Sequence, residues 1–460
     1  MRYLSTRGHG GDLGFTEVLL AGLAPDGGLY VPDHWPDLAA VSASAPYAEA
    51  AAAIMGPFIG DEFTADEFAA LCTDAYSSFS HGDVAPLVQI DDDHWLLELF
   101  HGPTLAFKDI ALQLVGRLFD RVLERSGERI TIVGATSGDT GSAAIDGVRG
   151  CEHVDIVILY PAGRTSEVQR RQMTTVTEAN VHAVAIDGTF DDCQDLVKAM
   201  FVDAAFRERL ALSAVNSINW ARVMAQIVYY VTASRSLGGP VTFSVPTGNF
   251  GNVLAGWIAR RMGAEIDGFV VASNTNDIVH RFISTGRMAT EAVVETLSPS
   301  MDIQVSSNFE RLLFEMNDRD PERTAAELVQ FRSTGVLEVD RGRFDAWIAP
   351  VFSSAAIDDA ATLAEISRVW RDCGLAIDPH TATGVAAART VAADGPIITL
   401  ATAHPAKFPD AVERATGQRP VLPDHLEDLY ERRERIVELP ADLAAVQAYI
   451  ERVSRVTSGG

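Results

Sequence analysis

The chain has 460 residues, of which 47% are apolar and 22% charged, a balance typical of globular proteins with more than one domain. Its formal net charge of −26 argues against nucleic acid or an anionic membrane as a partner, because an acidic surface repels phosphate. The sequence has no signal-peptide pattern, no apolar run long enough to cross a bilayer, no metal-ligand spacing and only four scattered cysteines, so we expect a cytoplasmic protein.

Residues 1–92 contain short helical patterns separated by turn-rich segments, which predicts a mainly helical N-terminal region. The apolar segment HWLLELF at 94–100 predicts a buried strand. Apolar residues then recur at helical spacing over 110–122, so we expect a buried helix that begins near Lys108. Because lysine is rarely buried unless it is paired or reactive, Lys108 is a candidate functional residue.

Strands and helices alternate from there on, which predicts parallel α/β layers. We expect strands over 129–135, 155–161, 180–187, 241–246, 268–274 and 396–403. We expect helices over 141–148, 191–206, 219–237 and 253–263, and a charged helical segment from 421 that frays over 456–460. The predicted domains are therefore 1–92, 93–215, 216–420 and a C-terminal helical extension, 421–460.

Two glycine-rich loops share one design, in which small polar residues connect a strand to a helix. They are VGATSGDTGSAA at 133–144 and FSVPTGNFGNVLAG at 243–256. Such a loop directs free backbone N–H groups and the positive end of the helix dipole at one point, so each could bind an anion. Neither loop is a Walker A or a GxGxxG motif, and a plain strand-to-helix turn has a similar composition.

A lysine at a helix start and two anion-binding loops together meet the requirements of pyridoxal phosphate chemistry on an amino acid. The amine of Lys108 could form a Schiff base if burial and positive potential keep it neutral. One loop could bind the cofactor phosphate and the other a substrate carboxylate. Composition and spacing alone do not establish this chemistry.

Longer motifs lie in order along the chain. They are YLSTRG, GLAPDGGLYVP, HGPTLAFKD, GATSGDTGSAA, VNSINWAR, SVPTGNFGN, SPSMDI, DPHTATG and TAHPAKF. With these motifs in this order, the chain resembles, over nearly its whole length, the longer form of the threonine synthase family found in yeast and many bacteria. The resemblance implies a pyridoxal-phosphate fold of the tryptophan-synthase-β type, with two parallel-sheet α/β domains and a mainly helical N-terminal region.

The resemblance also assigns the site residues by position. Lys108 would be the catalytic Schiff-base lysine, and Thr402 would face the ring nitrogen, with Thr381 and Thr383 as rival candidates. The cofactor phosphate would lie against Gly248, Asn249, Phe250, Gly251 and Asn252. The family often has Asp at the last of these positions, and Asn keeps the backbone N–H while it removes a negative charge. The substrate carboxylate would lie against Thr136, Ser137, Gly138, Asp139 and Thr140.

The implied reaction converts O-phospho-L-homoserine and water to L-threonine and phosphate. The amine of Lys108, once released by the substrate, would serve as general base in several steps. The departing phosphate needs donors, for which His101, Asn219, Arg222 and Arg164 are of suitable type, although each could instead be structural. The implied partner is the small-molecule substrate alone, with neither nucleic acid nor membrane, and members of this longer form are usually monomers.

The sequence leaves three other interpretations to compare with this one. The tripeptide Asp139-Thr140-Gly141 occurs in aspartic proteases, but those enzymes need a second carboxylate motif and an all-β pattern. A threonine dehydratase-like eliminase, or a lyase of another phosphorylated amino acid, would keep the cofactor and change the outcome. A catalytically silent binding protein on this fold is disfavoured by the presence of Lys108.

Overall fold

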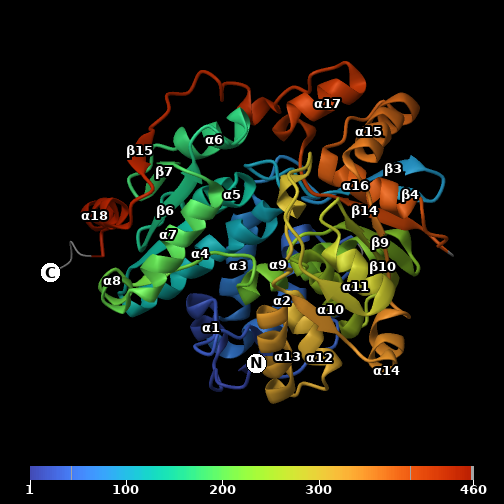
Figure 1. Cartoon of the computed structure of the whole chain (residues 1–460), viewed down its shortest axis with the longest axis horizontal. Coiled ribbons are helices and arrows are strands. Elements are labelled where there is room, and N and C mark those ends of the chain that lie inside the picture. Colours follow the sequence, from blue (N-terminus) through green and yellow to red (C-terminus); the bar gives the residue numbers. More distant parts are fainter. Residues whose placement is uncertain (43, 394, 457–460) are drawn as a thin grey trace.

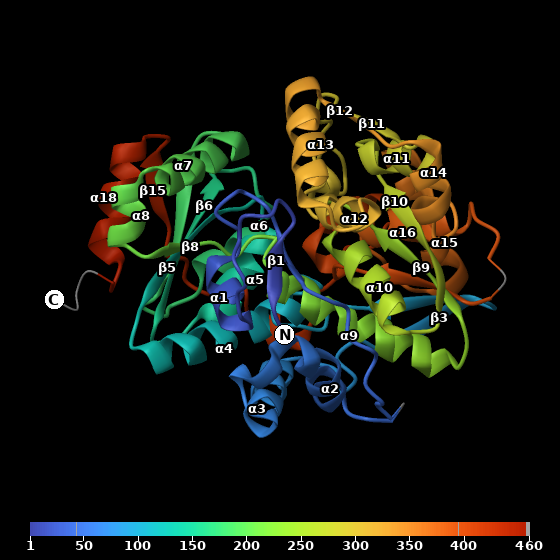
Figure 2. The ribbon, with the colours of Figure 1, turned by 90° about the horizontal axis from the view of Figure 1, so that it is seen from below.

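Two sheets packed against helices form the two lobes of the molecule (Figures 1 and 2). The computed structural model describes residues 1–42, 44–393 and 395–456, so most of the predicted fraying over 456–460 lies outside the described residues. The α/β fold class predicted from the sequence is confirmed. Within the described part of the chain, no helix has the length and apolar character needed to span a bilayer.

The first lobe contains a fully parallel sheet of five strands in the order β15-β7-β6-β5-β8. These strands are β5 (Ile130–Ala135), β6 (Val154–Pro161), β7 (Val181–Asp187), β8 (Leu212–Ser213) and β15 (Val437–Pro440). The helices of this lobe are α4 (Lys108–Ser126), α5 (Asp139–Val148), α6 (Glu167–Thr174), α7 (Phe190–Val202), α8 (Ala204–Arg209) and α18 (Leu443–Val453). Every residue of β6 is buried, as expected for a strand covered on both faces.

The second lobe contains six strands in the order β13-β10-β9-β14-β4-β3, of which only β3 is antiparallel to its neighbour. They are β3 (Leu87–Asp91), β4 (His94–Glu98), β9 (Val241–Pro246), β10 (Ile266–Ser273), β13 (Phe352–Ala356) and β14 (Ile397–Ala401). The main helices are α9 (Trp220–Leu237), α10 (Gly251–Met262), α11 (Ile278–Thr285), α15 (Asp359–Cys373), α16 (Pro379–Ala388) and α17 (Pro409–Thr416). Helix α9 is buried along most of its length and contacts α4 of the first lobe.

The N-terminal region packs against α9 through aromatic side chains. It comprises β1 (Tyr3–Ser5), α1 (Phe15–Ala21), β2 (Tyr30–Pro32), α2 (Tyr47–Ile59), η1 (Gly60–Glu62) and α3 (Ala65–Tyr76). The indole of Trp220 donates a hydrogen bond to the hydroxyl of Tyr3 at 3.0 Å, and this hydroxyl donates to the carbonyl of Phe58 at 2.7 Å. These contacts fix the start of the chain to the helix that runs between the lobes (Figure 2).

The remaining elements cover the second lobe and the connections between the lobes. They are β11 (Arg287–Ala289), η2 (Pro299–Met301), α12 (Phe309–Met316), α13 (Pro321–Thr334), β12 (Val336–Glu338), α14 (Arg341–Arg343), η3 (Phe344–Ile348), η4 (Pro405–Lys407) and η5 (Asp424–Leu426). Strands β11 and β12 form an antiparallel pair of their own.

Three sequence-based expectations differ from the structure. The helix expected over 191–206 is two helices, because Asp203 ends α7 and caps α8 by accepting from the Phe206 N–H at 3.1 Å. The extension over 421–460 is not purely helical, because β15 pairs with β7 and completes the first sheet. The sequence places the strand after residue 93 in the domain 93–215, yet β4 pairs with β14 in the second sheet. Sheet membership is thus set by pairings between distant parts of the sequence.

Candidate active site

A pocket of about 560 Å³ lies at the carboxyl ends of β5, β9 and β14 and is lined by residues of both lobes. The predicted site residues that line it are Lys108, Thr136, Ser137, Asp139, Thr140, Arg222, Gly248, Asn249, Phe250, Gly251, Asn252 and Thr402. The carboxyl edge of parallel strands is where helix N-termini and connecting loops converge in α/β proteins. The fold therefore brings together both glycine-rich loops and the candidate lysine.

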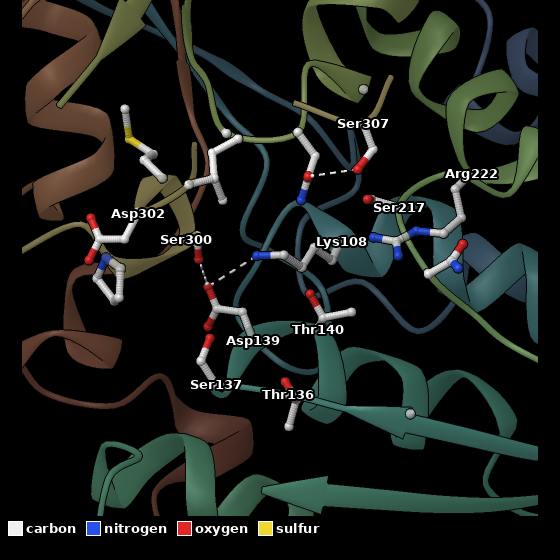
Figure 3. A pocket seen from close by; sticks show the side chains of 18 of the residues that line it. Lys108, Thr136, Ser137, Asp139, Thr140, Ser217, Arg222, Ser300, Asp302 and Ser307 are labelled. Carbon is white, nitrogen blue, oxygen red and sulfur yellow. Dashed lines mark hydrogen bonds and ion pairs between the residues drawn. The ribbon is translucent and has the colours of Figure 1, made fainter. Parts of the chain in front are cut away.

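Lys108 is the first residue of α4 and its side chain is only 9% exposed. Its Nζ donates a hydrogen bond to Oδ2 of Asp139 at 3.3 Å, as Figure 3 shows. Burial lowers the pKa of the Lys108 ammonium, and the positive charges of Lys407 and Arg222 act in the same direction against the pull of Asp139. A buried amine with a lowered pKa is suited to nucleophilic and base chemistry.

Asp139 is the first residue of α5, and its carboxylate is shared by two ammonium groups. Oδ1 lies 2.9 Å from Nζ of Lys407 and accepts a hydrogen bond from Nε2 of Gln169 at 2.9 Å. Burial opposes ionisation of this carboxyl, yet Lys407 and Lys108 together hold its pKa well below the usual range. The sequence indicated a role for the loop backbone, whereas the structure adds an ionised side chain at the centre of the pocket.

The first glycine-rich loop is held in place by Thr136. Its Oγ1 accepts hydrogen bonds from the N–H of Gly138 at 3.0 Å and the N–H of Gly141 at 2.9 Å. Gly138 has φ 150°, and a Cβ there would lie 2.4 Å from the side chain of Gln169. Glycine is therefore required where the chain turns into α5, and Thr136, Ser137 and Thr140 line the pocket around this turn.

The second loop connects β9 to α10 and presents donors at the opposite side of the pocket. Phe250, the residue before α10, has a left-handed backbone conformation with φ 61°. Asn252 accepts hydrogen bonds at Oδ1 from the hydroxyls of Tyr229 and Tyr230, while its buried Nδ2 has no hydrogen-bond partner. Free N–H groups at a helix N-terminus, with an additional unpaired amide, form a suitable site for a phosphate.

Arg222 of α9 is 4% exposed and lines the pocket. Its buried Nε has no hydrogen-bond partner, and among the described residues no carboxylate forms an ion pair with it. Burial lowers the pKa of this guanidinium to about 10. A buried arginine without a counter-ion is costly unless an anion binds beside it, so Arg222 marks an anion site.

The comparisons with known proteins agree with this geometry along the whole chain. The family models "Threonine synthase N terminus", "Pyridoxal-phosphate dependent enzyme" and "Threonine synthase, C-terminal" match residues 2–76, 84–338 and 381–450. The chain is 52% identical to the threonine synthase of Pseudomonas aeruginosa, in an alignment that covers 98% of both chains. It is 40% identical to the threonine synthase of Saccharomyces cerevisiae, in an alignment that covers 98% of this chain and 97% of that protein. The chain belongs to the threonine synthase family.

Solved structures of threonine synthases also share the fold. The crystal structure of pyridoxal-phosphate-bound threonine synthase from Brucella melitensis has a TM-score of 0.96 at 49% identity, covering 99% of this chain and all of that one. The yeast threonine synthase structure has a TM-score of 0.93 at 38% identity, covering 98% of both chains. The predicted enzyme class, a pyridoxal-phosphate-dependent lyase, and the predicted cofactor are therefore confirmed.

The residues of this chain fit pyridoxal phosphate. Lys108, a buried lysine with a lowered pKa, would hold the carbonyl carbon of the cofactor. The N-terminus of α10, with the unpaired amide of Asn252, would hold its phosphate, and the pocket-lining hydroxyl of Thr402 would face its ring nitrogen. The rivals of Thr402 do not line the pocket: Thr381 donates to Asp378, and Thr383 donates to the Pro379 carbonyl within α16.

The structure does not place three phosphate-donor candidates in the pocket lining. His101 pairs with Glu98 at 2.8 Å, and Arg164 is exposed after β6. Asn219 caps α9 through the Ala221 N–H at 3.0 Å and donates to the Leu19 carbonyl, so its side chain has a structural task. Sequence proximity to a motif suggested these residues, but the side chains of His101 and Asn219 form hydrogen bonds elsewhere and that of Arg164 is exposed outside the pocket lining.

Other functional candidates were missed in the sequence. Lys407, in the motif TAHPAKF, ion-pairs with Asp139 across 268 positions, a contact that no local spacing predicts. Ser300, in the motif SPSMDI, donates to Oδ2 of Asp139 at 3.4 Å, and its N–H donates to Nε2 of His380 at 3.2 Å. Ser217 lies in the pocket lining near Arg222 (Figure 3). The sequence motifs marked the segments that contain these residues as functional, but they did not indicate the individual side chains.

Proposed function

We propose that this protein converts O-phospho-L-homoserine and water to L-threonine and phosphate. The observation that carries the proposal is the buried Arg222 guanidinium, which lies in the same pocket as Lys108 and forms no ion pair with a carboxylate among the described residues. The cofactor phosphate has its own site at the N-terminus of α10, so Arg222 leaves room for a second phosphate. A substrate that carries a phosphate, an amine and a carboxylate fits this arrangement.

We assign the groups of the substrate to separate parts of the pocket. The backbone of residues 136–140 binds the carboxylate at the N-terminus of α5. Arg222, with the pocket-lining side chains Asn216 and Ser217, binds the phosphate and stabilises it as it leaves. Separate anion sites at the two ends of the substrate hold its carbon chain beside Lys108 and thereby set the positions at which protons are exchanged.

Lys108 acts as the general base of the reaction. When bound, pyridoxal phosphate supplies an electron sink that makes the hydrogen atom on the amino-bearing carbon acidic, and then those on the next carbon. The neutral Nζ of Lys108 accepts a proton from the substrate and returns it at a later position, and Asp139 stabilises the resulting ammonium at 3.3 Å. Thr402 offers the ring nitrogen a neutral hydroxyl, which does not hold a proton there as a carboxylate would.

The proposal is tested by the visible spectrum of the purified protein and by its release of phosphate from O-phospho-L-homoserine. We expect a yellow protein that forms phosphate and threonine in equal amounts. Lys108→Ala should lose both the absorbance and the activity, while Lys198→Ala, at a largely exposed lysine, should stay yellow. A yellow protein that released no phosphate from this substrate would contradict the assignment of Arg222.

We further propose that the protein acts as a monomer in the cytoplasm, with no nucleic-acid partner. Four cysteines without a disulfide among the described residues, and the net charge of −26, support this. Light scattering of the yellow protein measures the mass directly. A mass of twice 49.5 kDa would contradict the monomer.

A further inference from the structure

Lysine is rare in this chain and is concentrated at the pocket. Of 37 lysines and arginines, only three are lysines: Lys108, Lys198 and Lys407. Lys108 and Lys198 line the pocket, and Lys407 lies directly behind it, in contact with Asp139. At all other positions the positive charge is carried by arginine, so these three positions are candidates for tasks that require a compact ammonium group.

Lys407 cannot itself be the reactive amine. Its side chain is fully buried and is not part of the pocket lining. Its Nζ lies 2.7 Å from the carbonyl of Thr104, 3.2 Å from Oε1 of Gln172 and 2.9 Å from Oδ1 of Asp139. An ammonium has three N–H groups, and here each has an acceptor, so Lys407 is a fixed cation.

Lys108, in contrast, must change its charge during its task as nucleophile and base. If Asp139 had Lys108 as its only cation, it would become a buried unpaired anion whenever Lys108 was neutral, and it would hold the proton on Lys108 strongly. The ammonium of Lys407 prevents both effects, because Asp139 keeps its ion pair with Lys407 whether Lys108 is charged or neutral. Figure 3 shows the Asp139 side chain directed at Lys108 and Ser300.

We propose that Lys407 is a positioning residue for the reactive amine. It shares the Asp139 carboxylate with Lys108, so that this carboxylate stays ionised and oriented toward Lys108 while part of its negative charge is neutralised by Lys407. The inference rests on the proposed role of Lys108. Lys407, the buried ammonium of η4, thereby affects the chemistry although it does not contact the substrate.

Other charged groups face this pair and act on it. Arg222 from α9 lowers the pKa of Lys108, and His380 from α16 lowers that of Asp139. On the other side of Lys407 lies Asp109, whose pKa is raised to about 7 by burial and which accepts from the N–H and hydroxyl of Thr104. These groups remain in every variant described below, so differences between variants report on Lys407 and Asp139.

The test is the pH dependence of the visible absorbance of the cofactor-loaded protein. Lys407→Met removes a positive charge near the nitrogen of Lys108 and should move the midpoint upward by about one pH unit, a tenfold change in proton affinity. Asp139→Asn removes the negative charge and should move it downward. Arg341→Met, at a side chain that is 80% exposed, paired with Asp345 and outside the pocket lining, should leave it unchanged. No upward shift in Lys407→Met would overturn the proposal.

A second measurement does not depend on the folding of Lys407→Met. Because the chain has three lysines, protein labelled with ¹³C at the lysine Cε gives three signals, which Lys198→Arg and Lys108→Ala assign. The Lys407 signal should move in Asp139→Asn, because its Nζ lies 2.9 Å from Oδ1 of Asp139, whereas the Lys198 signal should not. An unchanged Lys407 signal in Asp139→Asn would overturn the proposal. A protein without visible absorbance would instead contradict the proposed function, and the comparison of the Lys407 signals would still be decisive.

Discussion

At the scale of single residues, the pocket holds two buried cations in opposite situations. Lys108 has a carboxylate within 3.3 Å, whereas Arg222 has a buried Nε with no partner. An unpaired buried charge lowers the free energy of unfolding, so its presence indicates a task that offsets this cost. Stability and function therefore conflict at Arg222.

Arg222→Met tests this conflict. The substitution replaces an unpaired charge by an apolar side chain of similar length, so we expect the melting temperature not to fall while kcat/KM falls by about 100-fold, roughly 3 kcal/mol for a charge-assisted contact. Phosphate added to the unsubstituted protein should raise its melting temperature, and this increase should vanish in Arg222→Met. A large loss of stability with normal kinetics would show that the guanidinium is structural.

Thr402→Val tests the assignment of the ring-nitrogen partner. Removing the hydroxyl should weaken cofactor binding by about tenfold, the value of one hydrogen bond in a closed site. Cofactor affinity is measured by titration of the visible absorbance. Thr383→Val is the matched control, because its hydroxyl donates to the Pro379 carbonyl within α16 and should affect stability alone. If Thr402→Val bound the cofactor normally, the partner would have to be sought elsewhere.

At the scale of elements, the loop between β9 and α10 works only because its backbone approaches another segment closely. A Cβ at Gly248 would lie 2.5 Å from the carbonyl oxygen of Ser300. Ser306 also donates to the Gly248 carbonyl at 2.8 Å, so the loop is held to the segment that carries Ser300. The phosphate loop and the segment over 299–307 thus form one unit.

Gly248→Ala should push the phosphate loop away from the segment over 299–307. The added methyl group must displace Ser300, and we expect cofactor affinity to fall about tenfold, since overpacking of this kind costs about 1–3 kcal/mol. Gly56→Ala is the control, because no atom lies within 4 Å of its added Cβ and alanine favours the helical conformation of α2. That control should bind cofactor normally and be slightly more stable. Equal cofactor affinity in both variants would contradict the coupling.

At the scale of the whole molecule, periodicity and motifs predicted the alternating strands and helices, the α/β class and Lys108. They did not predict β15, because a four-residue strand between charged segments has too little apolar pattern to stand out. They also did not predict that Asp139 pairs with Lys407 or that Arg222 has no carboxylate partner among the described residues. Such facts depend on contacts between distant segments, which spacing along the chain does not encode.

Acid should destabilise the folded protein through His94. This side chain contacts Thr399 at 2.7 Å, and burial lowers its pKa from 6.5 to about 4. Between these values the unfolded chain binds a proton that the folded chain does not, so the free energy of unfolding decreases as pH falls, by up to about 3 kcal/mol. Urea unfolding of His94→Gln should show less acid sensitivity, while His34→Gln, at a largely exposed side chain, should not differ from the unsubstituted protein.

Strand β14 lies between β9 and β4 in the second sheet, although it is formed by residues 397–401. During synthesis the hairpin of β3 and β4 must therefore wait for about three hundred further residues before the strand that joins it to β9 leaves the ribosome. The same late segment delivers Thr402 and Lys407. A nascent chain thus exposes Lys108 long before its surroundings exist, and the pocket and the second sheet are completed together once residues 397–407 have been synthesised.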